Sequence, residues 1–227
     1  MKSNKTPANT KKKLLVVDDH PMMRQGLAQL ITNEPDLVIC AEAENGRQAI
    51  EAIPKAKPDL VLADISLPDK NGLELIKDIQ ALHAGLPVLV ISMHEESLYA
   101  ERVLRAGGRG YIMKQEGGKK LMEAIRQVLG GRIYVSEKIS SKILEGLSGH
   151  SANASHPKVE MLTDREFEVL QLLGQGRGTR EVSQQLHLSI KTIEVHRANI
   201  KKKLGLKTAT ELIRYAVQWV ETQSVGQ

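Results

Sequence analysis

The chain has 227 residues, enough for two domains, and its 41% hydrophobic and 26% charged content is ordinary for a globular protein. Its single cysteine, Cys40, excludes an intramolecular disulfide framework and a multi-cysteine zinc site, and fits a reducing cytosol. No apolar run approaches the roughly 18 residues of a membrane span, and the basic first residues lack the apolar stretch of a signal peptide. We therefore expect a cytoplasmic protein with no membrane partner.

Short apolar runs recur through the first half of the chain, and helix-length amphipathic segments separate them. The runs are residues 14–17, 37–41, 60–63, 88–91 and 111–113. Runs this short and this rich in Val, Ile and Leu are typical of parallel strands buried on both faces. Joined by crossover helices, they predict an α/β fold, a flavodoxin-like (βα)5 doubly wound parallel sheet of order 2-1-3-4-5.

Four of these runs end on polar side chains. The first leads into Asp18 and Asp19, and the third, fourth and fifth strands lead into Asp64, Ser92 and Lys114. Ligands of a parallel sheet bind beyond the carboxyl ends of its strands, so these side chains should meet there. Three carboxylates repel one another unless a hard cation such as Mg²⁺ holds them, and a lysine and a hydroxyl complete a clamp for a phosphoryl group. The set predicts a site that makes and holds an aspartyl phosphate.

The pattern changes after residue 131. Residues 134–147 suit one isolated amphipathic helix, and the small, polar stretch 148–157 is typical of a linker. Thr163 and Glu166 fit a capping box, and helical patterns follow to residue 174 and over 180–186, 190–204 and 209–220. We therefore expect a basic disordered leader over 1–11, an α/β domain over 12–132, a linker with one amphipathic helix over 133–158, and an all-α four-helix domain over 159–227.

Four sequence motifs carry a resemblance to a known family. They are VVDDHP at residues 16–21, DISLPDKNG at 64–72, AGGRGYIMK at 106–114 and TIEVHRANIKKKL at 192–204. Because it has these four motifs in this order, the chain resembles two-component response regulators of the NarL/FixJ type, in which a receiver domain is joined to a LuxR-type helix-turn-helix. The resemblance implies a transcription regulator and not an enzyme.

The resemblance also implies how the first domain works. A sensor histidine kinase would phosphorylate Asp64, the phosphoacceptor, in a Mg²⁺-dependent reaction, and Ser92 and Lys114 would contact the phosphoryl oxygens. The implied Mg²⁺ ligands are Asp18, Asp19, Asp64 and the main-chain carbonyl of Ser66. Tyr111 matches the aromatic switch position of receivers, which swings inward when Ser92 moves toward the phosphoryl group. Ser66 and His94 occupy positions that tune the phosphate lifetime.

In the second domain, residues 180–186 would form the scaffold helix and residues 190–204 the recognition helix, which fits the major groove of double-stranded promoter DNA. The candidate DNA-contact residues are Lys191, Thr192, Glu194, Val195, Arg197, Lys201 and Lys202. LuxR-type domains dimerise through their final helix, and the residues expected at that interface are Leu212, Ala216 and Val217. Phosphorylation would shift the population toward a DNA-binding homodimer.

Two alternatives belong to other functional classes. A Mg²⁺-dependent phosphohydrolase of the haloacid dehalogenase type would also use Asp64 as nucleophile, but it carries a second carboxylate two residues later, where Ser66 stands. A protein-interaction module would use the second domain without DNA, which the basic surface of residues 190–204 disfavours. Neither the cognate kinase nor the operator follows from the sequence.

Overall fold

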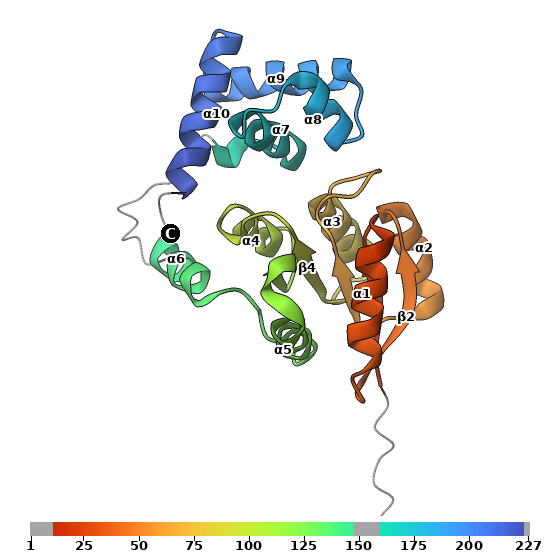
Figure 1. Ribbon diagram of the computed structural model, residues 1–227. Coiled ribbons are helices and arrows are strands. Elements are labelled where there is room, and N and C mark those ends of the chain that lie inside the picture. Colours follow the sequence, from red (N-terminus) through yellow and green to blue (C-terminus); the bar gives the residue numbers. More distant parts are fainter. Residues whose placement is uncertain (1–10, 148–158, 225–227) are drawn as a thin grey trace, which may run out of the picture. The chain divides into compact units, whose positions relative to one another are not determined.

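Figure 1 shows the computed structural model of the chain, in which residues 11–147 and 159–224 are described. The predicted leader, apart from Lys11, and the linker stretch 148–157 lie outside the described residues. The chain divides into two compact units, Met1–Val135 and Ser136–Gln227. No helix in the described part of the chain combines the length and the apolar character that crossing a membrane requires.

The first unit is built on a five-stranded parallel sheet in the order β2-β1-β3-β4-β5. The strands are β1 (Lys12–Val17), β2 (Leu37–Ala43), β3 (Leu60–Ala63), β4 (Val88–Ser92) and β5 (Gly110–Met113). The predicted sheet and its strand order are therefore confirmed. Val17 pairs with Ala63 across β1 and β3, so the next residue of each strand, Asp18 and Asp64, leaves the sheet at the same edge.

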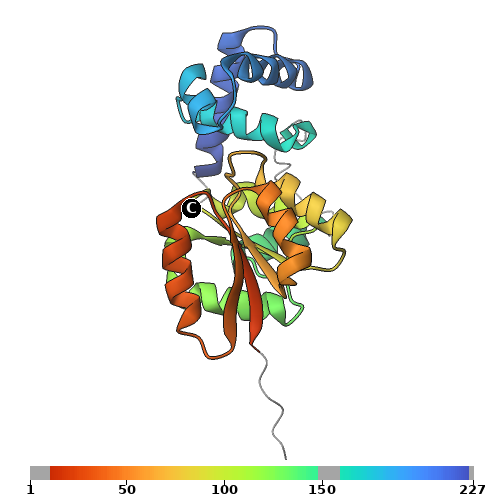
Figure 2. The ribbon, with the colours of Figure 1, turned by 90° about the vertical axis from the view of Figure 1, so that its right-hand side faces the viewer.

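Helices cover both faces of this sheet (Figures 1 and 2). They are α1 (Pro21–Thr32), α2 (Gly46–Ala56), α3 (Gly72–Leu82), α4 (Glu96–Arg105) and α5 (Gly117–Leu129), with the short 3-10 turn η1 (Lys114–Glu116) before α5. Leu27 of α1 and Ile125 of α5 share one buried cluster with Leu14, Leu62 and Leu89 of the sheet. This aliphatic core holds the strand ends in fixed register, because close-packed side chains leave the strands no room to slide.

The second unit is helical throughout its described part. Its elements are α6 (Glu137–Leu147), η2 (Val159–Met161), α7 (Asp164–Gly174), α8 (Thr179–Gln185), α9 (Ile190–Leu204) and α10 (Ala209–Ser224). The predicted capping box is present, since Thr163 accepts from Glu166 N–H and the Glu166 side chain accepts from Thr163 N–H. The rings of Phe167 in α7 and Trp219 in α10 pack edge to face, with their centroids 5.3 Å apart. This contact holds the final helix against the core of the unit.

The helix predicted over residues 134–147 begins later, at Glu137. Tyr134 instead pairs with the edge of the sheet, because its carbonyl accepts from Tyr111 N–H at 2.9 Å and its N–H donates to Arg109 O at 3.0 Å. The amphipathic pattern is a weaker constraint here than the unpaired edge of β5, whose N–H and C=O groups need partners.

Candidate functional site

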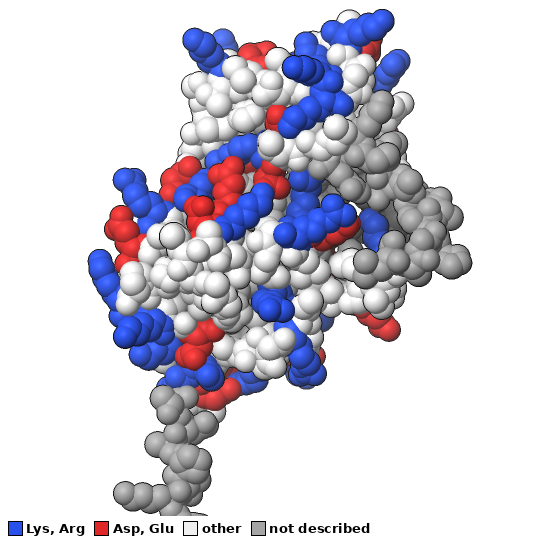
Figure 3. Space-filling model, turned by 180° about the vertical axis from the view of Figure 1, so that it is seen from behind, with Lys and Arg blue, Asp and Glu red and all other residues white. Residues whose placement is uncertain are grey.

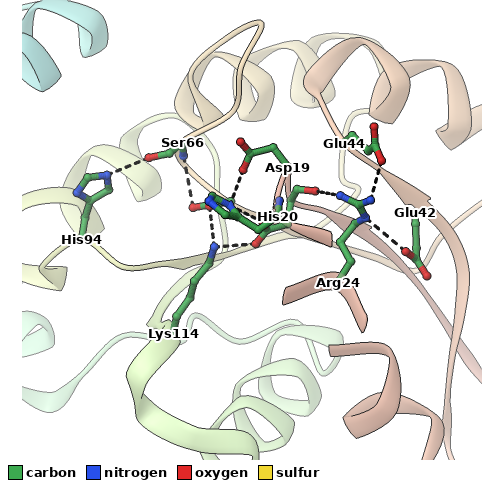
Figure 4. Close-up of polar contacts among 10 residues, drawn as sticks. Asp19, His20, Arg24, Glu42, Glu44, Ser66, His94 and Lys114 are labelled. Atoms are coloured by element: carbon green, nitrogen blue, oxygen red, sulfur yellow. Dashed lines mark hydrogen bonds and ion pairs between the residues drawn. The ribbon is translucent and has the colours of Figure 1, made fainter. Parts of the chain in front are cut away.

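Three of the predicted site residues meet at the carboxyl edge of the sheet. The Lys114 ammonium lies 2.7 Å from Asp18 Oδ2 and 2.7 Å from Asp64 Oδ2, and so bridges the two carboxylates (Figure 4). Asp18 is fully buried, and the side chains of Asp64 and Lys114 are 5% and 4% exposed. One cation shared between two buried anions leaves the cluster with net negative charge in a low-dielectric surrounding.

Burial raises the pKa of Asp64 above the ordinary carboxyl value; the charge of Lys114 opposes this shift, and the charge of Asp18 adds to it. Burial works against the charge on Lys114, but the Asp64 charge and the hydrogen bonds to both carboxylates raise the pKa of Lys114 above its usual value. Lys114 is therefore a permanent cation. An anionic Asp64, the form that can act as a nucleophile, is favoured by further positive charge at the site.

Asp19 and His20 extend the acidic cluster toward solvent. His20 N–H donates to Asp18 Oδ1 at 2.9 Å, and His20 Nδ1 lies 2.7 Å from Asp19 Oδ1, which nevertheless has no hydrogen-bond partner among the described residues. Ligand atoms of Asp18, Asp19, His20 and Asp64 all lie within 4.8 Å of one another. A hard cation prefers carboxylate oxygens such as these, so the acidic residues fit a divalent metal.

A hydrogen-bonded chain links the remaining predicted residues. Ser92, fully buried at the end of β4, accepts from His94 N–H at 3.2 Å, and Tyr111 OH donates to His94 O at 2.7 Å. His94 Nε2 lies 3.0 Å from Ser66 Oγ, while Ser66 N–H donates to Asp64 Oδ1 at 3.3 Å. Burial and the charge of Lys114 lower the pKa of His94 to about 4, so its ring is neutral near pH 7. Tyr111 is 1% exposed and thus lies inward.

In the second unit, the predicted DNA-contact residues all lie on α9. Lys191, Glu194, Val195 and Lys202 are exposed, while Thr192, Arg197 and Lys201 are partly buried. The opposite face of α9 packs inward through Ile193, Ile200 and Leu204. Ser189 caps the helix, accepting from Thr192 N–H at 3.1 Å. Lysine and arginine side chains are exposed over the surface of this unit, at the top of Figure 3, with acidic side chains among them.

Comparisons with known proteins assign a protein family to each of the two units. The model described as "Response regulator receiver domain" matches residues 14–126, and the model described as "Bacterial regulatory proteins, luxR family" matches residues 160–216. The oxygen regulatory protein NreC of Staphylococcus aureus (strain bovine RF122 / ET3-1) is 34% identical over 211 residues, which are 91% of this chain and 97% of NreC. The chain belongs to the NarL/FixJ-type response regulators.

Solved structures agree with this assignment. A LuxR-family two-component response regulator from Aurantimonas sp. SI85-9A1 is 31% identical, with a TM-score of 0.57, over 61% of this chain and 99% of that chain. RcsB from Salmonella enterica serovar Typhimurium, solved bound to promoter rprA in the presence of the phosphomimetic BeF3-, is 26% identical, with a TM-score of 0.60, over 92% of this chain and 99% of RcsB. This response regulator is thus a LuxR-type transcription regulator and not an enzyme.

The loop after Asp64 contains residues whose positioning roles the sequence did not reveal. A Cβ at Gly72 would collide with Asp64 O, so this response regulator needs glycine where the loop returns to the strand end. The Asp69 carboxylate accepts from Gly46 N–H and Arg47 N–H, each at 2.9 Å, and so caps α2 from a distant loop. In the sequence, only the place of Gly72 at the end of the motif over residues 64–72 pointed to such a role.

The predicted dimer interface of the second unit needs correction. Leu212 and Ala216 are both 0% exposed, because this side of α10 packs against α7, where Gly174 lies directly over Ala216. They are core residues and offer no surface to a partner subunit, unlike the partly exposed Val217. Lys203, near the end of α9, forms an ion pair with Glu166 at 2.6 Å and so ties α9 to the start of α7.

Proposed function

We propose that this response regulator is controlled by phosphorylation of Asp64, with phosphate supplied by a sensor histidine kinase in the cytoplasm. A bond would form between an Asp64 carboxylate oxygen and phosphorus while the bond from phosphorus to the kinase histidine nitrogen breaks. The receiver would span residues 12–132, and the linker 133–158 would connect it to the DNA-binding domain over 159–227. The observation that carries the proposal is the shared contact of Lys114 with Asp18 and Asp64.

The side chains of the site would act by position and charge. Asp18, Asp19, Asp64 and the main-chain carbonyl of Ser66 would hold Mg²⁺, which when bound neutralises charge on phosphoryl oxygens. The Lys114 ammonium, fixed between two carboxylates, can turn to a phosphoryl oxygen beside Asp64, and the Ser92 hydroxyl can donate to another. No general base is needed when Lys114 and a bound cation keep Asp64 in its carboxylate form.

An Asp64→Asn variant tests the acceptor. The amide is a poor nucleophile and lacks the charge that favours a cation, so labelling by acetyl phosphate in the presence of Mg²⁺ should be lost. Asp59→Asn is the matched control, because it makes the same substitution of amide for carboxylate at the opposite end of β3. The Asp59 carboxylate there pairs with Lys12 at 3.0 Å. Labelling of Asp64→Asn at the rate of the wild-type protein would place the acceptor elsewhere.

We further propose that α9 binds the major groove of promoter DNA. Exposed Glu194 and Val195 can read base edges, since Glu accepts from cytosine N4 and Val contacts a thymine methyl, while Lys202 can bind phosphate. Glu194→Ala or Val195→Ala should therefore change sequence preference, and Lys202→Ala should weaken binding to all sequences alike and flatten its salt dependence. If all three variants bound like the wild-type protein, α9 would not be the reading helix.

Phosphorylation of Asp64 would favour a homodimer through the exposed side of α10. Val217 is partly exposed there, and Ile213, one turn earlier, is 44% exposed. Sedimentation with and without beryllofluoride should show a rise in mass that Ile213→Glu prevents. Gln218→Glu, which adds the same single negative charge at another exposed position of α10, is the control for charge alone. An unchanged mass on activation of the wild-type protein would contradict the proposal.

A further inference from the structure

The most enclosed arginine near the site is Arg24, in the first half of α1, whose side chain is 11% exposed. Its Nη1 donates to the main-chain carbonyl of Asp18 at 2.6 Å, and its Nη2 donates to Glu44 Oε1 at 2.7 Å. Nε lies 3.5 Å from Glu42 Oε2. Figure 4 shows the guanidinium reaching across from α1 to these two glutamates of the β2–α2 region. A buried cation with three such contacts is held in one orientation.

The contact to Asp18 is made through its main chain, on the residue whose carboxylate faces Lys114. Asp18 N–H in turn donates to Ala43 O at 3.1 Å, at the end of β2. Both main-chain groups of Asp18 are thereby tied to the β2 side of the sheet, one directly and one through Arg24 and its glutamates. Asp18 and the neighbouring Asp19 thus project their carboxylates from a main chain that is held on both sides.

The loop that follows Asp64 is tied to the same region, because Asp69 caps the start of α2 immediately after Glu44 and Asn45. The segments that carry Asp18 and Asp64 are therefore both held by the same support, which consists of the end of β2 and the start of α2. Arg24 is the only charged side chain among the described contacts that joins the β1–α1 turn to this support.

We propose that Arg24 is a positioning residue for the cation site: it holds the Asp18 main chain so that Asp18 and Asp19 present their carboxylates to a divalent cation. Its own donors are taken up by Asp18 O, Glu42 and Glu44, so it would act on the cation only through the Asp18 main chain. The inference rests on the proposed function and adds a residue that acts on cation affinity through the backbone. Groups that orient metal ligands in this indirect way commonly change metal affinity when they are removed.

The test uses the full-length protein and Mg²⁺ binding measured by titration calorimetry. In Arg24→Met, which keeps the length of the side chain but loses its donors, the dissociation constant for Mg²⁺ should rise by about tenfold or more. Arg126→Met is the matched control: Arg126 also links a helix to a distant loop through two carboxylates, Glu34 and Asp36, but away from the site. Its Mg²⁺ affinity should stay at the wild-type value.

A second readout separates positioning from general weakening of the fold. Labelling by acetyl phosphate, measured against Mg²⁺ concentration, should show a raised half-saturating Mg²⁺ in Arg24→Met and a rate at saturating Mg²⁺ close to that of the wild-type protein. If circular dichroism shows that Arg24→Met is unfolded, Glu44→Gln takes its place. Glu44 is 59% exposed, and the substitution weakens the bond to Arg24 Nη2 without burying a new group, because a neutral amide oxygen is a weaker acceptor than a carboxylate, so a smaller rise is expected.

Wild-type Mg²⁺ affinity in a folded Arg24→Met, or in Glu44→Gln when the first variant does not fold, would overturn the inference and leave the proposed function intact. A fall in Mg²⁺ affinity of equal size in Arg126→Met would also overturn it, since the effect would then be one of general stability. Failure of the wild-type protein to bind Mg²⁺ or to be labelled at all would overturn the proposed function, and the inference with it.

Discussion

Gly72→Ala should damage both the stability of the receiver and its labelling. The new Cβ would collide with Asp64 O and would lie 2.7 Å from Ile65 Cα, where ordinary contact begins at 3.4 Å. The loop or the end of β3 must therefore move by at least about 0.7 Å at Ile65, and by more at Asp64 O, which is the closer atom. Overpacking of this kind costs about 1–3 kcal/mol.

The same movement weakens a hydrogen bond. Gly72 N–H donates to Ile65 O at 2.7 Å, which fixes the start of α3 beside the acceptor. Its loss adds about 1 kcal/mol, so the free energy of unfolding should fall by about 2–4 kcal/mol in total. Because the displaced atoms belong to Asp64 and its neighbour, the rate of labelling by acetyl phosphate should fall as well.

Gly26→Ala is the matched control. Gly26 is in the interior of α1, and a Cβ there would meet nothing within 4 Å. This variant should gain about 1 kcal/mol from helix propensity and keep its labelling rate. Urea denaturation followed by far-ultraviolet circular dichroism measures the first quantity, and acetyl phosphate labelling the second. A Gly72→Ala protein that matched the wild type in both would refute the steric reasoning.

Three further outcomes follow from particular contacts. Burial raises the pKa of Glu166, but hydrogen bonds from Lys203 and from main chain outweigh it and leave the pKa below the ordinary 4.5; the stability this contributes is complete above that value and is lost as pH falls through the lowered pKa. Urea denaturation followed by the fluorescence of the single tryptophan should therefore show Glu166→Gln less stable than the wild-type protein at neutral pH, and the difference should shrink as pH falls through the lowered pKa; a difference that does not change with pH would contradict this reasoning. Lys203→Ala should lower the same stability with little effect on DNA affinity, whereas Lys202→Ala should do the reverse in a filter-binding assay; equal effects of both on DNA binding would contradict the ion pair. Tyr111→Phe removes the hydrogen bond to His94 O and should cost about 1 kcal/mol in urea denaturation of the receiver, and a neutral result would mean that the hydroxyl is satisfied elsewhere.

The sheet and the central cluster of the site could be predicted from the sequence for one physical reason. Parallel strands in register end at one edge, so a polar residue directly after each apolar run has few places to go. The pairing of Val17 with Ala63 then brings Asp18 and Asp64 together without any information about side-chain packing. The helix over residues 190–204 could be predicted equally well, because Ile193 and Ile200 mark its buried face by their spacing.

Contacts between loops could not be predicted in this way. Arg24 stands in an amphipathic helix, where a charged residue usually faces solvent, and its partner Glu42 lies beyond the run 37–41 that marked the strand. The strand continues to Ala43, and its register with β1 shifts between Leu14 and Leu15, which no periodicity records.

The final helix shows a different limit of the sequence. Leu212 and Ala216 are apolar, and nothing in their pattern distinguishes packing against α7 from packing against another subunit. Gly174 was the missing information, since only a residue without a side chain lets α10 approach α7 this closely.

The site is assembled from segments that are far apart in the chain. Lys114 is 96 residues from Asp18 and 50 residues from Asp64, and no two of the three are held together by local structure. Contacts of such long sequence separation form late, because the intervening chain must be ordered first. On the ribosome, a nascent chain that has exposed Asp64 but not yet β5 has the two carboxylates without the lysine that bridges them. The charged cluster therefore forms only when the whole receiver has been made, so under the proposed function an unfinished chain would not yet accept a phosphoryl group.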